Sequence, residues 1–154
     1  MQKKVVSRSI FIEAPAEKVW RVLLDDTTYR QWTAVFHPGS YAESDWKEGS
    51  KVLFKTPEGD GMVSKVIVSR PYEEISFQHL GVLKNNVEYF DDASNEWQGF
   101  ETYRLKPAGN GTELLIEQDL DEKHVDWFQA TWEKALLKVK ELAEEQINQT
   151  VATH

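Results

Sequence analysis

Residues 10–32 read IFIEAPAEKVWRVLLDDTTYRQW, and this stretch decides the fold class. Ile10 and Ile12 alternate with other residues as in a half-buried β-strand. Pro15 then stands where the first turn of a helix tolerates proline. From Val19 to Leu24 the apolar residues recur at helical spacing. We therefore predict a strand, a short amphipathic helix and a second helical turn that carries a tryptophan.

Six further short strands follow, separated by turns rich in glycine and proline. We predict these strands at Tyr41–Trp46, Lys51–Thr56, Gly61–Val68, Glu74–Leu83, Trp97–Lys106 and Glu113–Leu120. The pattern then changes to one long amphipathic helix from His124 to Ile147. Strands in sequence, flanked by helices, indicate an α+β fold with an antiparallel sheet.

The segment Lys84–Glu96 is acidic and polar, and we expect it to form a long, mobile hairpin loop that gates a cavity. Tyr89 and Phe90 are its apolar exceptions. They either fold over a ligand or pack on the edge of the sheet, and both alternatives stay open at this point.

Composition limits the classes of function. A chain of 154 residues is expected to be one domain, spanning residues 1–154. It contains no cysteine, which excludes disulfides and thiol chemistry. A net charge of −8 without a basic cluster argues against binding to nucleic acid. Because no leader and no long apolar run appear, we expect a cytoplasmic protein with no insertion into membranes.

Alternation along three predicted strands places four polar side chains on faces that are otherwise apolar. They are His79 beside Phe77, Glu101 and Tyr103 beside Trp97, and Gln118 beside Leu114. Polar groups in an apolar interior cost several kcal/mol when they are unpaired, so these should pair with each other, with water or with a ligand. They form either a satisfied polar cluster or the polar end of a ligand site.

Four segments carry a resemblance to a known family. They are Glu13–Trp20 (EAPAEKVW), Gly61–Gly81, Gly99–Leu105 (GFETYRL) and Trp132–Glu144. They resemble the START-like (SRPBCC) superfamily, and within it the small bacterial proteins grouped with the Hsp90 ATPase activator homologues. The resemblance implies a helix-grip fold, in which a curved antiparallel sheet of about seven strands wraps around the long C-terminal helix.

The same resemblance implies a small hydrophobic ligand, aromatic or lipid-like, between the sheet and that helix. Phe128 and Trp132 are then expected as walls, because the start of the helix lies beside the cavity in similar folds. Phe77, Trp97 and Leu114 are expected as further apolar contacts of the ligand, and Gln118 as a polar one. Trp20 and Trp32 are expected to be structural, with Trp32 also a candidate for a lid. His79, Glu101 and Tyr103 are expected to provide the polar end of the cavity.

Other functions stay open. A His–Glu or His–Tyr pair would suit acid–base chemistry of the cyclase or dehydratase type, although no spacing demands it. A chaperone-linked or stress-related interaction and a homodimer are further alternatives implied by the resemblance. The four histidines lack metal-ligand spacing, and no nucleotide-binding motif appears, so we expect no metal and no cofactor.

Overall fold

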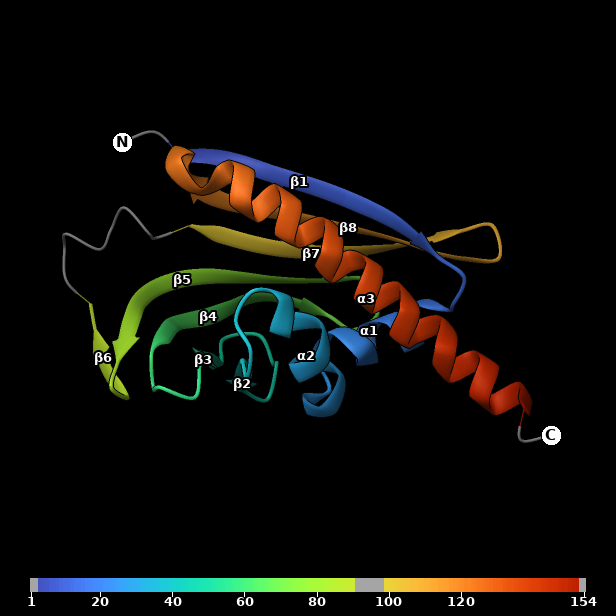
Figure 1. Ribbon diagram of the computed structural model, residues 1–154, viewed down its shortest axis with the longest axis horizontal. Coiled ribbons are helices and arrows are strands. Elements are labelled where there is room, and N and C mark those ends of the chain that lie inside the picture. Colours follow the sequence, from blue (N-terminus) through green and yellow to red (C-terminus); the bar gives the residue numbers. More distant parts are fainter. Residues whose placement is uncertain (1–2, 91–98, 153–154) are drawn as a thin grey trace.

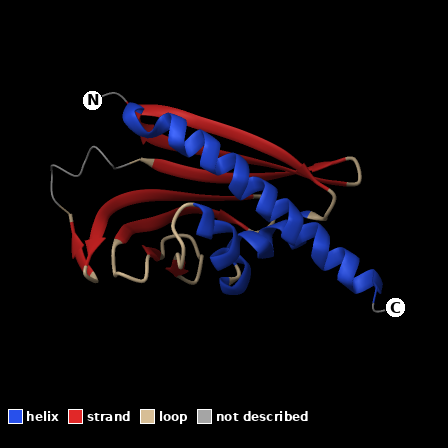
Figure 2. Cartoon of the chain, in the orientation of Figure 1, coloured by secondary structure: helices blue, strands red, loops and turns tan. Residues whose placement is uncertain are grey.

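The computed structural model describes residues 3–90 and 99–152. The chain forms an open, curved antiparallel sheet with one long helix running diagonally across it and two short helices beside that helix (Figures 1 and 2). In chain order the elements are β1 (Lys3–Ile12), α1 (Ala16–Leu24), α2 (Asp26–Trp32), η1 (Thr33–Val35), β2 (Tyr41–Glu43), β3 (Lys51–Lys55), β4 (Gly61–Arg70), β5 (Glu74–Lys84), β6 (Val87–Tyr89), β7 (Phe100–Ala108), β8 (Gly111–Asp121), η3 (Glu122–His124) and α3 (Val125–Ala152). The predicted α+β helix-grip fold is confirmed.

The order of the strands explains how distant segments meet. In the described part of the chain the sheet runs β1-β8-β7-β5-β4-β3-β2, with β6 paired to β5. Strand β5 therefore lies in the middle, where it pairs with β7 through residues 74–78 and with β6 through residues 82–84. Because β7 also pairs with β8, three central strands present their inward side chains to one space beneath α3.

The core lies between α3 and the sheet. The apolar stripe of α3 is buried, as its periodicity predicts, and includes Ala135, Leu136 and Val139. Near the end of this stripe, Glu144 accepts a hydrogen bond from the backbone N–H of Glu13 at 2.8 Å. The helix is thereby joined to the segment between β1 and α1.

The segment after β5 differs from the prediction of a long loop. Val87–Tyr89 forms the short strand β6, which pairs with the end of β5. Asn85 and Asn86 make the connecting turn with φ angles of 52° and 66°. Asparagine tolerates this left-handed conformation, which two-residue hairpins require. The predicted gating loop from residue 91 onward, with Trp97, lies outside the described residues.

Tyr89 and Phe90 are both exposed, and they lie against the sheet at Gly81. A Cβ atom at Gly81 would meet the Tyr89 carbonyl oxygen at 2.4 Å and Phe90 Cδ1 at 2.8 Å. Glycine at this position thus allows the close approach. The Phe90 ring thus lies against the sheet, as in the second of the two arrangements that the sequence left open.

The two tryptophans near the N-terminus occupy different environments. Trp32 is 1% exposed, and its indole N–H donates a hydrogen bond to the carbonyl of Leu23 at 3.3 Å. Trp20 is only partly buried, because Val19 and Leu23 occupy the inward face of α1. Its ring packs edge-on against Tyr72 at the rim of the core, with ring centroids 6.2 Å apart.

Candidate functional site

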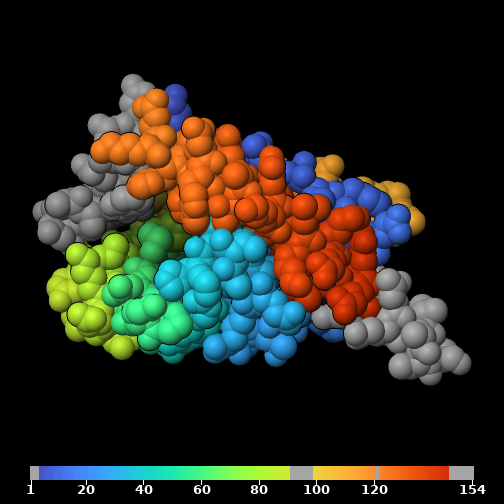
Figure 3. Space-filling model, viewed as in Figure 1, coloured from blue at the N-terminus to red at the C-terminus, as the bar shows by residue number. Residues whose placement is uncertain are grey.

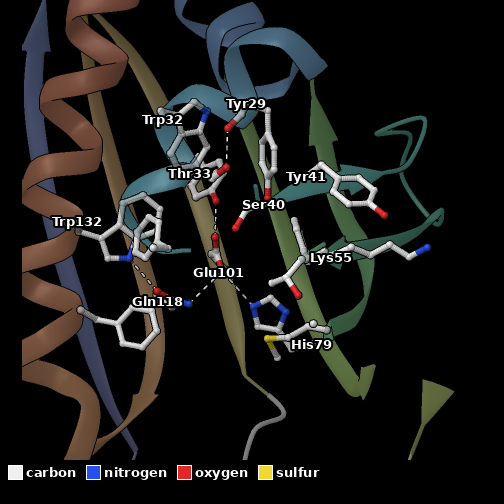
Figure 4. Close-up of a pocket in the computed structure, with 17 residues that line it drawn as sticks. Tyr29, Trp32, Thr33, Ser40, Tyr41, Lys55, His79, Glu101, Gln118 and Trp132 are labelled. Carbon is white, nitrogen blue, oxygen red and sulfur yellow. Dashed lines mark hydrogen bonds and ion pairs between the residues drawn. The ribbon is translucent and has the colours of Figure 1, made fainter. Parts of the chain in front are cut away.

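A cavity of about 220 Å³ lies between the sheet, α3 and the helices that follow β1. Figure 3 shows α3 (orange to red) resting against the segment that carries these helices (blue to cyan). The cavity is lined by Tyr29, Trp32, Thr33, Phe36, Ser40, Tyr41, Phe54, Lys55, Thr56, Gly61, Met62, His79, Glu101, Tyr103, Gln118, Phe128 and Trp132. More than half of these side chains are aromatic or apolar, and His79 and Gln118 meet at Glu101 (Figure 4).

Glu101 is the centre of a hydrogen-bond network. Its Oε1 contacts His79 Nε2 and Gln118 Nε2, each at 3.1 Å, and its Oε2 accepts a hydrogen bond from the Tyr103 hydroxyl (Figure 4). Strand register explains this convergence, because Glu101 pairs with Phe77 on β5 and with Gln118 on β8. The Glu101 side chain keeps 12% of its surface exposed.

His79 is held by both of its ring nitrogens. Since an ionised carboxylate only accepts hydrogen bonds, Nε2 carries the proton that is donated to Glu101. On the other side, Nδ1 lies 2.6 Å from the hydroxyl oxygen of Ser64 on β4. A neutral imidazole then accepts a hydrogen bond from Ser64 at Nδ1. The ring is therefore fixed in place and in tautomer.

The hydrogen-bonded series Ser64–His79–Glu101 contains the residue types of a hydrolytic triad, but its arrangement does not suit nucleophilic attack by the serine. Ser64 is 1% exposed and does not line the cavity, whereas Glu101 does. A nucleophile has to reach its substrate. The serine therefore positions the imidazole, and the carboxylate is the group that faces the cavity.

Gln118 is oriented from the side of α3. The indole N–H of Trp132 donates to Gln118 Oε1 at 2.8 Å, which leaves the amide N–H of Gln118 for Glu101. Trp132 is 2% exposed. The helix thus contributes to the polar end of the cavity as well as to its wall.

Aromatic rings surround the rest of the cavity. Phe36 packs edge-on against Trp132 at 4.9 Å between ring centroids, and it also contacts Phe128 at 6.0 Å. Trp32 lies 6.2 Å from Tyr103 and 5.9 Å from Trp132. Each ring packs against its neighbours, so the walls form a continuous aromatic surface.

Two phenols are kept neutral. Burial, followed by the negative charge of Glu101, raises the pKa of Tyr103 well above its usual value of 10.0. Burial and the same charge also raise the pKa of Tyr29. Tyr103 therefore remains a hydrogen-bond donor to Glu101 over the whole physiological range of pH.

The structure brings together most of the candidate residues. Seven of them line the cavity: Trp32, His79, Glu101, Tyr103, Gln118, Phe128 and Trp132. Phe77 and Leu114 do not line it. Both are fully buried in the core, because the inward face of each strand is longer than the cavity. Trp97 lies outside the described residues.

Several residues of the site were not found from the sequence. Ser64, behind His79, shares the inward face of β4 with Met62 and Val66, so its place in the alternation could have identified it. Tyr29 lies in α2 and Phe36 directly follows η1, and no periodicity indicates that these short helices fold over the sheet. Within residues 3–90 and 99–152, no cluster of three His, Asp or Glu side chains could hold a metal ion. No helix in this part of the chain is long and apolar enough to span a membrane.

Comparison with solved structures identifies similar folds. A protein from Mesorhizobium loti is 18% identical, with a TM-score of 0.71 over 92% of this chain and 98% of that chain. The Aha1 dimer from Colwellia psychrerythraea is 20% identical, with a TM-score of 0.69 over 92% of this chain and 96% of that chain. A protein from Cytophaga hutchinsonii is 21% identical, with a TM-score of 0.69 over 96% and 99%. At such low identity these similarities concern the fold alone.

Comparison of the sequence with family models identifies a family, which the likeness of folds does not. A comparison with curated proteins finds no match. The family described as Activator of Hsp90 ATPase homolog 1-like protein matches residues 13–144, which include every described residue that lines the cavity. The chain therefore belongs to the Activator of Hsp90 ATPase homolog 1-like protein family.

Proposed function

We propose that the protein binds a small, largely apolar ligand in the cavity between the sheet and α3. The observation that carries this proposal is a cavity with aromatic walls and a hydrogen-bonded carboxylate, Glu101, at one end. Ligand sites are typically apolar concavities with a few convergent polar groups. His79, Glu101, Tyr103 and Gln118 would then orient the ligand, against walls that include Trp132.

The size of the cavity limits the ligand. Sites for drug-sized molecules occupy roughly 300–1,000 Å³, whereas this cavity has about 220 Å³. A molecule with one or two rings fits this volume, and a long acyl chain does not. We therefore favour an aromatic ligand over a lipid.

The geometry disfavours His79 as a general acid or base. Both nitrogens of His79 are already engaged, one with Ser64 and the other with Glu101. A general base needs a nitrogen or oxygen within reach of the substrate proton. Transfer of a proton to a substrate would require this network to open first.

Equilibrium dialysis with indole, a neutral molecule with two rings, tests the proposal. Met62 lines the cavity, so Met62→Trp should place a larger ring there and lower indole affinity by about tenfold or more. Leu137→Trp is the matched control, because Leu137 is exposed on α3. Equal affinity in the two variants would contradict the proposal. Native mass spectrometry of freshly purified protein would then search for a co-purified ligand.

A homodimer is a second proposal, and the name of one similar structure supports it. The structure from Colwellia psychrerythraea is described as an Aha1 dimer. Light scattering coupled to size-exclusion chromatography measures the mass directly. The mass of one chain, 17.8 kDa, across a concentration series would contradict a dimer.

A further inference from the structure

We infer that the cavity selects an organic cation, namely a protonated amine attached to a small apolar group, with its N–H donating to Glu101. This inference rests on the proposed function and specifies the chemical class of the ligand. It follows from two observations: several donors of the protein are already bound to Glu101, and the negative charge of Glu101 has no fixed counter-ion.

Three donors at the polar end of the cavity are directed at one carboxylate. His79, Tyr103 and Gln118 each direct a donor to Glu101. A carboxylate has about four lone-pair sites, so three such bonds leave about one acceptor site. What Glu101 offers a ligand is therefore an acceptor. A ligand carboxylate would meet the negative charge of Glu101 there.

Two hydroxyl groups along the wall show the same preference. Thr33 donates to the carbonyl of Tyr29 at 2.6 Å, and Ser40 donates to the carbonyl of His37, also at 2.6 Å. Each of these two hydroxyls already donates its one hydrogen, so only its lone pairs remain for a ligand.

The charge on Glu101 has no fixed cationic partner. In the described part of the chain, His79 is the one basic side chain within ion-pair distance of Glu101, and it carries charge only when protonated. Among the described residues, Lys55 is the sole lysine or arginine lining the cavity. Its Nζ instead lies 3.4 Å from Glu43, and in Figure 4 its amino group points away from Glu101.

The surrounding rings make this charge more selective. A carboxylate that is largely shielded from water interacts more strongly with a counter-ion than an exposed one does. Aromatic rings also attract cations through their π-electrons. Rings of Tyr103 and Trp132 line the cavity beside Glu101, joined to it directly or through Gln118. An alkylammonium group would therefore gain from both the carboxylate and the walls.

Three probes of nearly the same shape test the inference: phenethylammonium, phenethyl alcohol and hydrocinnamate, which are cationic, neutral and anionic. Isothermal titration calorimetry at neutral pH gives their dissociation constants. We expect the unmodified protein to bind the ammonium at least about tenfold more tightly than the alcohol, the size of one charged hydrogen bond. Hydrocinnamate should bind most weakly.

Variants locate the effect. Glu101→Gln keeps the size of the side chain and removes its charge. The preference for the ammonium should then disappear, so that the dissociation constants of the ammonium and the alcohol become about equal. Glu117→Gln is the matched control, because Glu117 lies on β8 next to Gln118 but does not line the cavity. It makes the same change in net charge and should keep the preference.

The outcomes separate the two proposals. If the alcohol binds as tightly as the ammonium, the cavity binds ligands but the inference is wrong. Equal loss of preference in Glu101→Gln and Glu117→Gln would also overturn it, because the effect would then come from net charge. If no probe and no indole binds, both proposals fail. The comparison of probes in the unmodified protein stands without any variant, so it decides the question even if Glu101→Gln does not fold.

Discussion

The indole N–H of Trp132 on α3 donates to the side-chain oxygen of Gln118 on β8, 2.8 Å away. This bond determines which end of the amide faces Glu101, so the packing of the helix on the sheet also sets the polarity of the cavity. The first prediction tests the bond directly.

Trp132→Phe should lower the free energy of unfolding by about 1–3 kcal/mol, because the Gln118 oxygen loses its donor in a largely buried site. Urea denaturation measures the change. Trp127→Phe, on the same helix, is the control: Trp127 is 52% exposed, and the change should stay within about 0.5 kcal/mol. Equal effects of the two substitutions would contradict a structural role for the Trp132–Gln118 bond.

The two N-terminal tryptophans should differ in their contribution to stability. Trp32→Ala removes a ring that is 1% exposed and should cost about 3–5 kcal/mol. Trp20→Ala should cost clearly less, because Trp20 lies at the rim of the core. Denaturation midpoints of the two variants provide the comparison, and a larger loss for Trp20→Ala would show that the packing of α1 is misassigned.

Glu144 should make stability depend on pH in the acidic range. Burial of this carboxyl raises its pKa, but hydrogen bonds from Lys140 Nζ at 2.5 Å and from the Glu13 backbone N–H at 2.8 Å outweigh burial, so the net pKa lies below the usual 4.5. A lowered pKa in the folded state contributes stability that is present above about pH 4.5 and is lost as the pH falls further.

Glu144→Gln should therefore flatten the acidic arm of the curve of unfolding free energy against pH. Glu145→Gln, at the next position of α3, is exposed and serves as the control. Urea denaturation between about pH 3 and pH 6 covers the window. An acidic arm that is as steep in Glu144→Gln as in the control would rule out this contribution.

Tyr103 should make stability fall at alkaline pH. Its pKa is raised in the folded protein by burial and then by Glu101, whereas the unfolded chain ionises near the usual 10.0. The stability that it contributes is complete below that pH and is lost as the pH rises above it. Tyr103→Phe should weaken this alkaline loss, and Tyr72→Phe, at an exposed site, should not. Thermal melts above pH 9 decide the matter, and identical slopes in the two variants would refute the prediction.

Local patterns were sufficient for the α+β fold class and for most of the helices and strands. The alternation in the strands and the apolar stripe of α3 depend on which residues repeat along the chain, and burial follows that repeat. Alternation also placed His79, Glu101 and Tyr103 on inward faces, because side chains in a strand point to opposite sides in turn. The hairpin turn at Asn85 and Asn86 was readable in principle, and the polar composition around it concealed β6.

The tertiary structure decided which of these side chains form hydrogen bonds with one another. Alternation gives the face on which a side chain lies, but only the pairing of β5, β7 and β8 brings His79 and Gln118 to the two sides of Glu101. The roles of Ser64 and Trp132 depend on the neighbouring strand and on the long helix, which are distant in sequence. The sequence by itself determined the fold class and the inward polar residues. The folded chain decided that their donors converge on one carboxylate and leave it as an acceptor, because hydrogen bonding depends on distances between segments that no local pattern records.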